Sequence, residues 1–167
     1  MKKIYIAGPD VFLENGKEYG EILKQKCLTA GFEGLFPLDN DVQGETREEL
    51  AGNIKAGNIE LIKSCDIVIA NLSPFRGPEP DSGTVWEIGF AQGLGKIVIG
   101  YCADQRDLKT KTQEILGLSL SSHRDRQNLE IEDFGLTHNL MYAEVVLHHS
   151  FEQCLESLYC LPQPLLE

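Results

Sequence analysis

Residues 66–101 have the sequence DIVIANLSPFRGPEPDSGTVWEIGFAQGLGKIVIGY, and this stretch decides the fold. Residues 66–72 predict a continuous apolar strand, which suits a sheet that is covered on both faces. A loop rich in proline and glycine follows, then a helix over about 82–95 and a second strand over 97–101. This order predicts two parallel strands joined by a right-handed crossover.

The same alternation extends in both directions along the chain. Residues 103–126 are polar and weakly periodic, so we expect a long, partly helical excursion there. The remaining patterns predict a strand at 3–7, a helix at 16–30 closed by Gly31, a strand at 35–38, a helix at 46–64, a strand at 145–148 and a helix at 150–160. Together they predict an α/β fold, a doubly wound parallel sheet of five strands with helices on both faces.

Composition narrows the classes of partner. The 167 residues suit a single domain, 1–167, and 42% of them are hydrophobic. The formal net charge of -11 argues against a protein that binds nucleic acid electrostatically, because the phosphate backbone is also negative. No apolar run approaches the roughly 20 residues of a membrane helix, and the start MKKIYIAGPD enters a strand directly, so we expect neither signal peptide nor anchor. The five cysteines form no Cys-x-x-Cys pair, which indicates reduced thiols and a cytoplasmic location.

Two carboxylates fall where ligands bind in such folds, beyond the carboxyl ends of the strands. The segment PDSGTVWEIGF, residues 80–90, places Asp81 before a helix and Glu87 in its first or second turn. The helix dipole there favours an ionised carboxylate, which is what a nucleophile toward a sugar carbon must be. The alternative is structural: Thr84 and Glu87 fit a capping box, and Asp81 and Gly83 fit a cap and a turn.

Four segments together resemble the nucleoside 2-deoxyribosyltransferase family, in that family's order. They are KIYIAGPDVF, FPLDN, DIVIANLSPFRGPEPDSGTVWEIGFAQGLGK and FGLTHNLMY, and the likeness spans about residues 3–142. The resemblance implies a flavodoxin-like domain that moves 2'-deoxyribose between purine or pyrimidine bases by two displacements at the anomeric carbon. It implies neither a metal nor an organic cofactor.

The resemblance also implies roles for individual residues. Glu87 matches the family position of the nucleophile, and Tyr5 matches a tyrosine that orients that nucleophile. Asp81 matches the position that binds the 5' end of the sugar. The Asp81 carboxylate would accept a hydrogen bond from the 5'-hydroxyl of a nucleoside and repel the 5'-phosphate of a nucleotide. This favours nucleosides over nucleotides as substrates. The substrate pocket is expected to include Gly8, Phe12, Asp39, Asn58, Ser82, Gly83, Trp86, Asn139 and Met141.

Asn58 departs from the family pattern, because several members carry there an aspartate that protonates the leaving base. An amide cannot donate a proton in that sense, so the donor is left open between Asp39, Asp10 and water. Asn58 follows Ile54 by four residues and precedes Leu61 by three, so it should face the sheet edge. Asparagine here also occurs in a subgroup thought to handle mainly purines, so purines are favoured.

Two further expectations concern assembly and rival activities. Asn139 and Met141 match positions that reach into a neighbouring subunit's site, which implies a homodimer or higher homo-oligomer with shared active sites. One rival is a hydrolase of deoxynucleosides or their 5'-monophosphates that uses the same glutamate. Another is a non-catalytic nucleotide-binding module, in which Glu87 only caps its helix.

Overall fold

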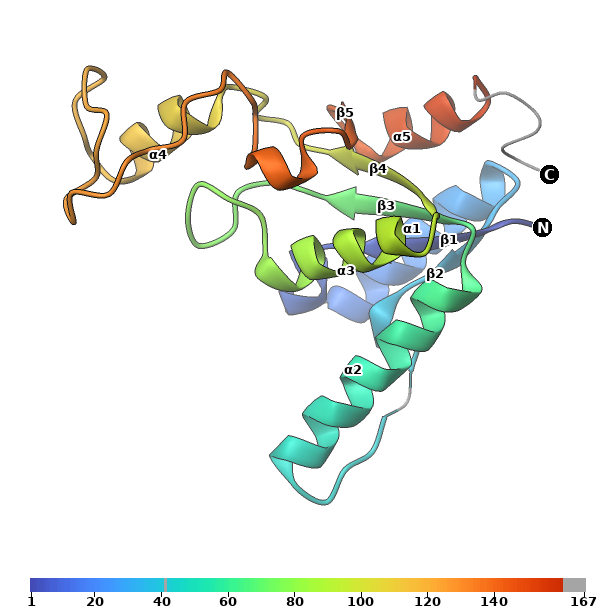
Figure 1. Cartoon of the computed structure of the whole chain (residues 1–167). Coiled ribbons are helices and arrows are strands. Elements are labelled where there is room, and N and C mark those ends of the chain that lie inside the picture. Colours follow the sequence, from blue (N-terminus) through green and yellow to red (C-terminus); the bar gives the residue numbers. More distant parts are fainter. Residues whose placement is uncertain (41, 161–167) are drawn as a thin grey trace.

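The computed structural model describes residues 1–40 and 42–160, and a sheet of five parallel strands lies at its centre (Figure 1). The strands stand in the order β2-β1-β3-β4-β5. Their bounds are β1 Lys3–Ala7, β2 Glu33–Leu35, β3 Ile67–Asn71, β4 Ile97–Tyr101 and β5 Val146–His148. This is the flavodoxin-like strand order, so the predicted doubly wound, five-stranded parallel sheet is confirmed.

The central strands are buried on both faces, which explains their apolar sequences. In β1, Ile4 and Ile6 belong to one hydrophobic cluster, whereas Tyr5 and Ala7 belong to the other. Successive side chains of a strand point to opposite faces, so each strand contributes to both layers. Tyr5 is completely buried although it carries a hydroxyl group. That hydroxyl therefore requires a hydrogen-bond partner inside the protein.

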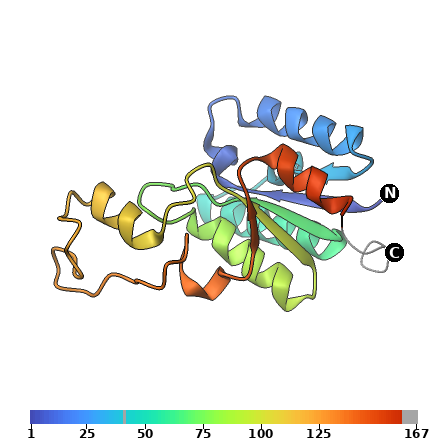
Figure 2. The ribbon, with the colours of Figure 1, turned by 90° about the horizontal axis from the view of Figure 1, so that it is seen from above.

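Helices cover both faces of the sheet (Figures 1 and 2). Leu23 of α1 and Phe151 of α5 pack on one face, and Ile62 of α2 and Ile88 of α3 pack on the other. The helix bounds are α1 Gly16–Thr29, α2 Arg47–Ser64, α3 Ser82–Gly93, α4 Leu108–Ile115 and α5 Phe151–Leu158. Gly31 follows α1 with a positive φ of 79°, as predicted for a glycine that ends a helix.

The second strand lies earlier than the sequence predicts. Residues 35–38 were expected to form it, but β2 ends at Leu35 and Pro37–Asp39 forms a short 3-10 helix, η2. Pro37 has no backbone N–H to continue a strand ladder. The Asp39 carboxylate accepts a hydrogen bond from the Phe36 amide at 2.9 Å, which closes the turn.

Residues 103–139 form an arm that projects from the carboxyl edge of the sheet (Figure 2). The arm contains α4 and a largely irregular return path, so the predicted, partly helical excursion is confirmed and extends further than residue 126. Several of its apolar side chains are exposed, namely Ile115, Leu120, Leu129 and Phe134. The arm is thus held by fewer buried side chains than the sheet and its helices.

The carboxyl ends of β1 and β3 lie side by side, at the point where the strand order reverses. Gly8 follows β1 there, and a Cβ at this position would lie 2.8 Å from Cβ of Asn71 and 2.7 Å from the Asp10 carboxylate. Only glycine fits between the two loops, which brings the backbone after β1 close to the loop after β3. Within residues 1–40 and 42–160, no helix is both long and apolar enough to cross a membrane.

Candidate active site

A cavity of about 440 Å³ opens at the carboxyl ends of β1 and β2, between α2 and the start of α3. Such crevices are where ligands bind in doubly wound folds, and the volume suits a small organic molecule. Six residues expected in the substrate site line it: Gly8, Phe12, Asn58, Asp81, Gly83 and Glu87. The other lining residues are Val11, Lys17, Pro37, Leu38, Asn40, Val42, Leu50, Ile54 and Thr84.

Glu87 points into this cavity and does not cap its helix. Its Oε1 atom accepts a hydrogen bond of 2.7 Å from the Tyr5 hydroxyl, across 82 residues of sequence. Asp81 caps α3 instead, because its Oδ2 atom accepts from the Thr84 amide at 3.0 Å. The capping-box interpretation of Glu87 is therefore wrong. The buried tyrosine of β1 finds its partner in this carboxylate.

Burial and neighbouring charge change the acidity of the pair. The pKa of Glu87 is raised to about 7: removal from water is the main cause and the nearby Asp81 carboxylate adds to the shift, while hydrogen bonds from Tyr5 and Asn58 oppose it. Burial also raises the pKa of Tyr5, so its hydroxyl stays protonated and donates. Glu87 is thus a carboxylate whose charge is only partly stabilised, a state common among reactive groups in enzyme clefts.

Asn58 is the second side chain that contacts Glu87. Its Nδ2 atom lies 3.4 Å from Glu87 Oε1, the same oxygen that Tyr5 binds. Asn58 therefore faces the sheet edge, as its position on α2 predicts. Because both donors converge on Oε1, the other carboxylate oxygen, Oε2, is outside these two hydrogen bonds.

Asp39, Trp86 and Ser82 lie outside the cavity lining. The Asp39 carboxylate accepts from Lys24 at 2.6 Å as well as from the Phe36 amide, so it behaves as a turn residue. Trp86 is about half exposed and stacks on Phe90 at 5.2 Å between ring centroids. Ser82 is exposed at the start of α3.

Asn139 and Met141 lie at the base of the arm and also outside the lining. Asn139 donates to Glu132 at 2.8 Å and accepts from the Met141 amide at 3.0 Å. Met141 is 76% exposed. Within one chain, the structure therefore does not bring these two residues to Glu87.

Sequence reasoning missed Asn40 and the two apolar residues Leu50 and Ile54 of α2 as lining residues. Leu50 and Ile54 are 37% and 43% exposed although the helical pattern places them on an apolar face. Their exposure is explained by the cavity, since they form its wall instead of packing on the sheet. The FPLDN segment contained Asn40, but only Asp39 of that segment was singled out.

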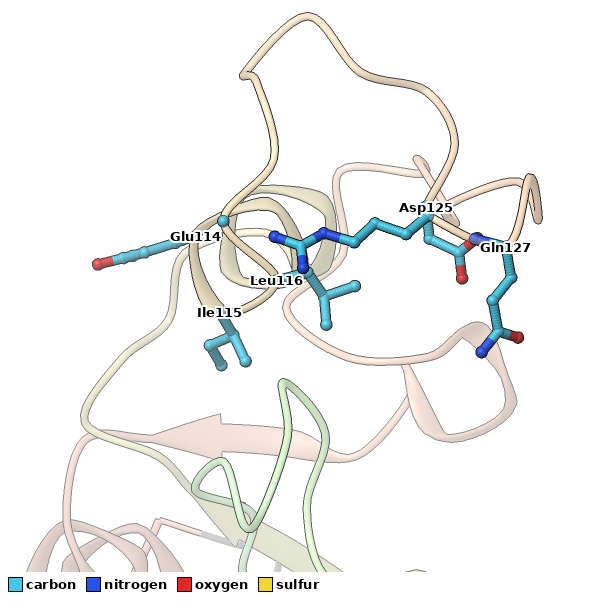
Figure 3. Close-up of a pocket in the computed structure, with 7 residues that line it drawn as sticks. Glu114, Ile115, Leu116, Asp125 and Gln127 are labelled. Carbon is cyan, nitrogen blue, oxygen red and sulfur yellow. The ribbon is translucent and has the colours of Figure 1, made fainter.

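A second cavity, of about 510 Å³, lies in the arm (Figure 3). It is lined by Glu114, Ile115, Leu116, Gly117, Asp125, Arg126 and Gln127. The Glu114 side chain is 61% exposed, pairs with Arg106 at 2.6 Å, and points away from Asp125 and Gln127 (Figure 3). This cavity therefore lacks a buried reactive group.

The fold and the first cavity together define a class of protein: a flavodoxin-like α/β protein with an acidic cavity beyond the carboxyl ends of its strands. The chain matches the family described as nucleoside 2-deoxyribosyltransferase over residues 4–141. The protein belongs to this family. Its members are glycosyl-transferring enzymes that act on nucleosides and nucleobases.

Solved structures agree with this assignment. A 2-deoxyribosyltransferase from Leishmania mexicana is 36% identical, with a TM-score of 0.76 over 95% of this chain and 97% of that one. A 2-deoxyribosyltransferase from Bacillus psychrosaccharolyticus shares the fold, with 22% identity and a TM-score of 0.56 over 92% of this chain and 90% of that one.

A curated relative of longer chain is also similar. An uncharacterized protein of Schizosaccharomyces pombe is 36% identical over 110 residues, which are 62% of this chain and 51% of that protein. The chain thus spans about half the length of this curated relative.

Proposed function

We propose that this protein transfers 2'-deoxyribose from one nucleobase to another through a covalent bond between the sugar and Glu87. The observation that carries the proposal is the placement of Glu87, which lines the cavity and binds Tyr5 while Asp81 caps the helix. A glutamate needed only for helix stability would not be held by a buried tyrosine from another element. A carboxylate in this position is suited to nucleophilic attack on a sugar carbon.

Glu87 Oε2 forms the new bond in this mechanism, because Oε1 is held by Tyr5 and Asn58. The oxygen attacks C1' of the deoxynucleoside, and the bond from C1' to the base nitrogen breaks with its electron pair going to the base. Negative charge on Glu87 stabilises the positive charge that builds on the sugar ring. A second base then attacks C1', releases Glu87 and loses its ring proton. Two inversions give net retention.

The leaving base must gain a proton, and in our proposal the source is water. Asn58 has no acidic proton, and Asp39 is bound by Lys24 outside the cavity. Asp10 accepts from Asn71 at 3.0 Å and does not line the cavity either. A purine has a basic ring nitrogen, N7, that can take up a solvent proton before the bond breaks. This supports the preference for purines.

Asp81 is proposed to bind the sugar's 5'-hydroxyl. Its Oδ2 atom is engaged with Thr84, and the residue lines the same cavity as Glu87. A carboxylate accepts a hydrogen bond from a hydroxyl and repels a phosphate dianion. The site should therefore use nucleosides in preference to nucleoside 5'-monophosphates.

We propose that the enzyme is at least a dimer in which Asn139 and Met141 complete the site of a neighbouring subunit. Exposed apolar side chains support this arrangement, since Met141, Leu140 and Trp86 are 76%, 48% and 47% exposed. Analytical ultracentrifugation of the protein and of Met141→Asp tests it. A wild-type monomer that shows full exchange would contradict the shared site.

Mass spectrometry of the protein mixed with 2'-deoxyinosine tests the central proposal. A mass increase of one deoxyribosyl group, mapped to the peptide that contains Glu87, is expected. Adding adenine should then produce 2'-deoxyadenosine with little free deoxyribose. Free deoxyribose without exchange would identify a hydrolase, and binding without either product would identify a non-catalytic module.

A further inference from the structure

Three side chains at the rim of the cavity form one cluster. Phe12, which lines the cavity, stacks on Phe75 with 5.5 Å between the ring centroids and 15° between the ring planes. The Arg76 guanidinium lies over both rings, 4.6 Å from the Phe75 centroid and 5.6 Å from the Phe12 centroid. Each group is therefore paired with the other two, and the cluster joins the loop after β1 to the loop after β3.

Little else covers the Phe12 ring. Phe12 ends the short 3-10 helix η1, Pro9–Phe12, which has no buried residue, and it is 60% exposed. The loop after β3 is better fixed, because the Phe75 amide donates a hydrogen bond of 2.9 Å to the Glu79 carbonyl and closes a turn. The position of the Phe12 ring at the cavity thus depends on Phe75 and Arg76.

The backbone of Arg76 is strained. Its φ is 56°, in the left-handed region that is unfavourable for every residue type with a Cβ atom. Within residues 1–40 and 42–160 no carboxylate forms an ion pair with Arg76, although the whole chain has a net charge of -11. The strained backbone thus directs an unpaired guanidinium onto two aromatic rings. Strain of this kind occurs mostly at functional sites.

The exposed Phe12 ring gives the cavity a flat apolar surface, which suits a nucleobase if the proposed function holds. A base that stacks on an aromatic ring excludes water from that face. Water and the second base compete for C1' of the deoxyribosyl group on Glu87. In both reactions the bond from C1' to Oε2 breaks, its electron pair returns to Glu87, and the attacking nitrogen or water loses a proton. Water yields free deoxyribose, and a closed apolar surface reduces that outcome.

We propose that Phe75 and Arg76 are positioning residues that hold Phe12 against the bound base. They thereby control how much of the deoxyribosyl intermediate passes to a base instead of to water. Neither residue contacts the reacting atoms in this proposal, because their effect passes through Phe12. The inference rests on the proposed function and adds two residues that control its outcome.

Arg76→Ala is the sharpest test, because alanine meets the same unfavourable backbone as arginine and only the guanidinium is lost. We would measure the Kd of free hypoxanthine by calorimetry, and the ratio of free deoxyribose to 2'-deoxyadenosine formed from 2'-deoxyinosine and adenine. Both values should rise at least about threefold in Arg76→Ala and in Phe75→Ala. Phe75→Tyr keeps the aromatic ring, so both values should stay within about twofold of the wild type.

The double variant Phe12→Ala/Arg76→Ala separates positioning from a direct role. If Arg76 acts through Phe12, loss of the guanidinium should change neither value by more than about twofold once the Phe12 ring is absent. Arg126→Ala is the matched control, because Arg126 is an exposed arginine of the arm, and it should leave both values unchanged. Equal effects of Arg76→Ala with and without the Phe12 ring would overturn the inference.

Binding of a free base requires no turnover, so the two proposals can fail separately. If the Kd responds as expected while the wild type forms no exchanged nucleoside, the proposed transfer fails and the positioning of Phe12 stands. If the wild type exchanges bases while Arg76→Ala changes neither value, the transfer stands and the positioning role is wrong. If exchange occurs and only the Kd responds, the cluster does not exclude water and the inference is also overturned.

Discussion

The cavity at Glu87 and the cavity in the arm differ in what lies behind their carboxylates. The arm cavity is larger, about 510 Å³ against 440 Å³, yet its Glu114 is 61% exposed and pairs with Arg106. Glu87 lies instead against a completely buried tyrosine, and burial raises the pKa of Glu87 to about 7. Cavity size therefore does not identify the reactive site. The feature that sets the proposed active site apart is a carboxylate that the fold holds partly out of water.

The largest contrast between the cavities is expected on removing their carboxylates. Glu87→Ala should lower the rate of deoxyribosyl exchange by at least about a thousandfold, because the nucleophile is lost. Its free energy of unfolding should change by no more than about 3 kcal/mol, because the Tyr5 hydroxyl loses its buried partner while Asp81 still caps the helix. Glu114→Ala should keep exchange within about twofold. Exchange assays and thermal unfolding of both variants check this, and a Glu87→Ala variant that keeps more than about a tenth of the wild-type exchange rate would refute the nucleophile.

Two capping aspartates give the next contrast, Asp81 in the site and Asp107 in the arm. Each accepts from a threonine amide three residues later, at 3.0 Å and 2.9 Å. Serine also caps helices, so Asp81→Ser and Asp107→Ser should both stay folded. Only Asp81→Ser should lower nucleoside use, by roughly tenfold or more, and raise the relative use of 5'-monophosphates. The measurement is kcat/KM for a nucleoside and for its 5'-monophosphate in each variant. If the ratio of these two values in Asp81→Ser equals that of the wild type, the role of Asp81 is contradicted.

Two tyrosine–glutamate pairs allow a test of orientation. Tyr5 binds Glu87, and Tyr142 binds Glu79 outside the cavity. The Tyr5 hydrogen bond favours the charged form of Glu87, so Tyr5→Phe should raise the pKa of Glu87 above about 7. The acidic limb of kcat/KM should move to higher pH, with a loss of about tenfold at pH 7. Tyr142→Phe should leave that limb in place. If Tyr5→Phe leaves the acidic limb of the pH profile in place, the assignment of that limb to Glu87 is contradicted.

The last contrast concerns stability, without any effect on a rate. The pKa of Glu87 is raised in the folded protein, from 4.5 to about 7, so its contribution to folding is most favourable below pH 4.5 and is lost as the pH rises through 7. Glu87→Gln removes this titration. Relative to the wild type, the variant should gain roughly 3 kcal/mol of unfolding free energy between pH 4.5 and pH 8. Urea unfolding at both pH values measures the change, and a constant difference would show that Glu87 titrates normally.

Local patterns in the sequence predicted most of the fold. The apolar runs of β1 and β3 are visible because both faces of these strands are buried. The error at β2 arose where Pro37 and the Asp39 side chain made a turn from residues that resemble a strand. The arm was predicted only as a polar, partly helical excursion, because its path depends on contacts that its own sequence does not encode.

The candidate site was less visible, since its decisive contacts connect distant parts of the chain. In the sequence, Thr84 and Glu87 fit a capping box as well as a nucleophile site, and the two interpretations are separated by the hydrogen bond from Tyr5 to Glu87 and by the Asp81 cap on Thr84. Asn40 and Asn58 line the same cavity from different elements, and no local pattern in the sequence connects them. Asp39 has a turn role that its neighbours Phe36 and Lys24 determine.

Helix α2 is anchored at one end. Of its 18 residues only Ile62, in the last turn, is fully buried, and Figure 1 shows its first turns extending away from the sheet. The distant wall of the cavity, with Leu50 and Ile54, belongs to this weakly supported half. Backbone amides there should exchange with deuterated solvent faster than those near Ile62, and slow down when a nucleoside is bound. Part of the binding energy of each substrate is then used to order the protein that encloses it.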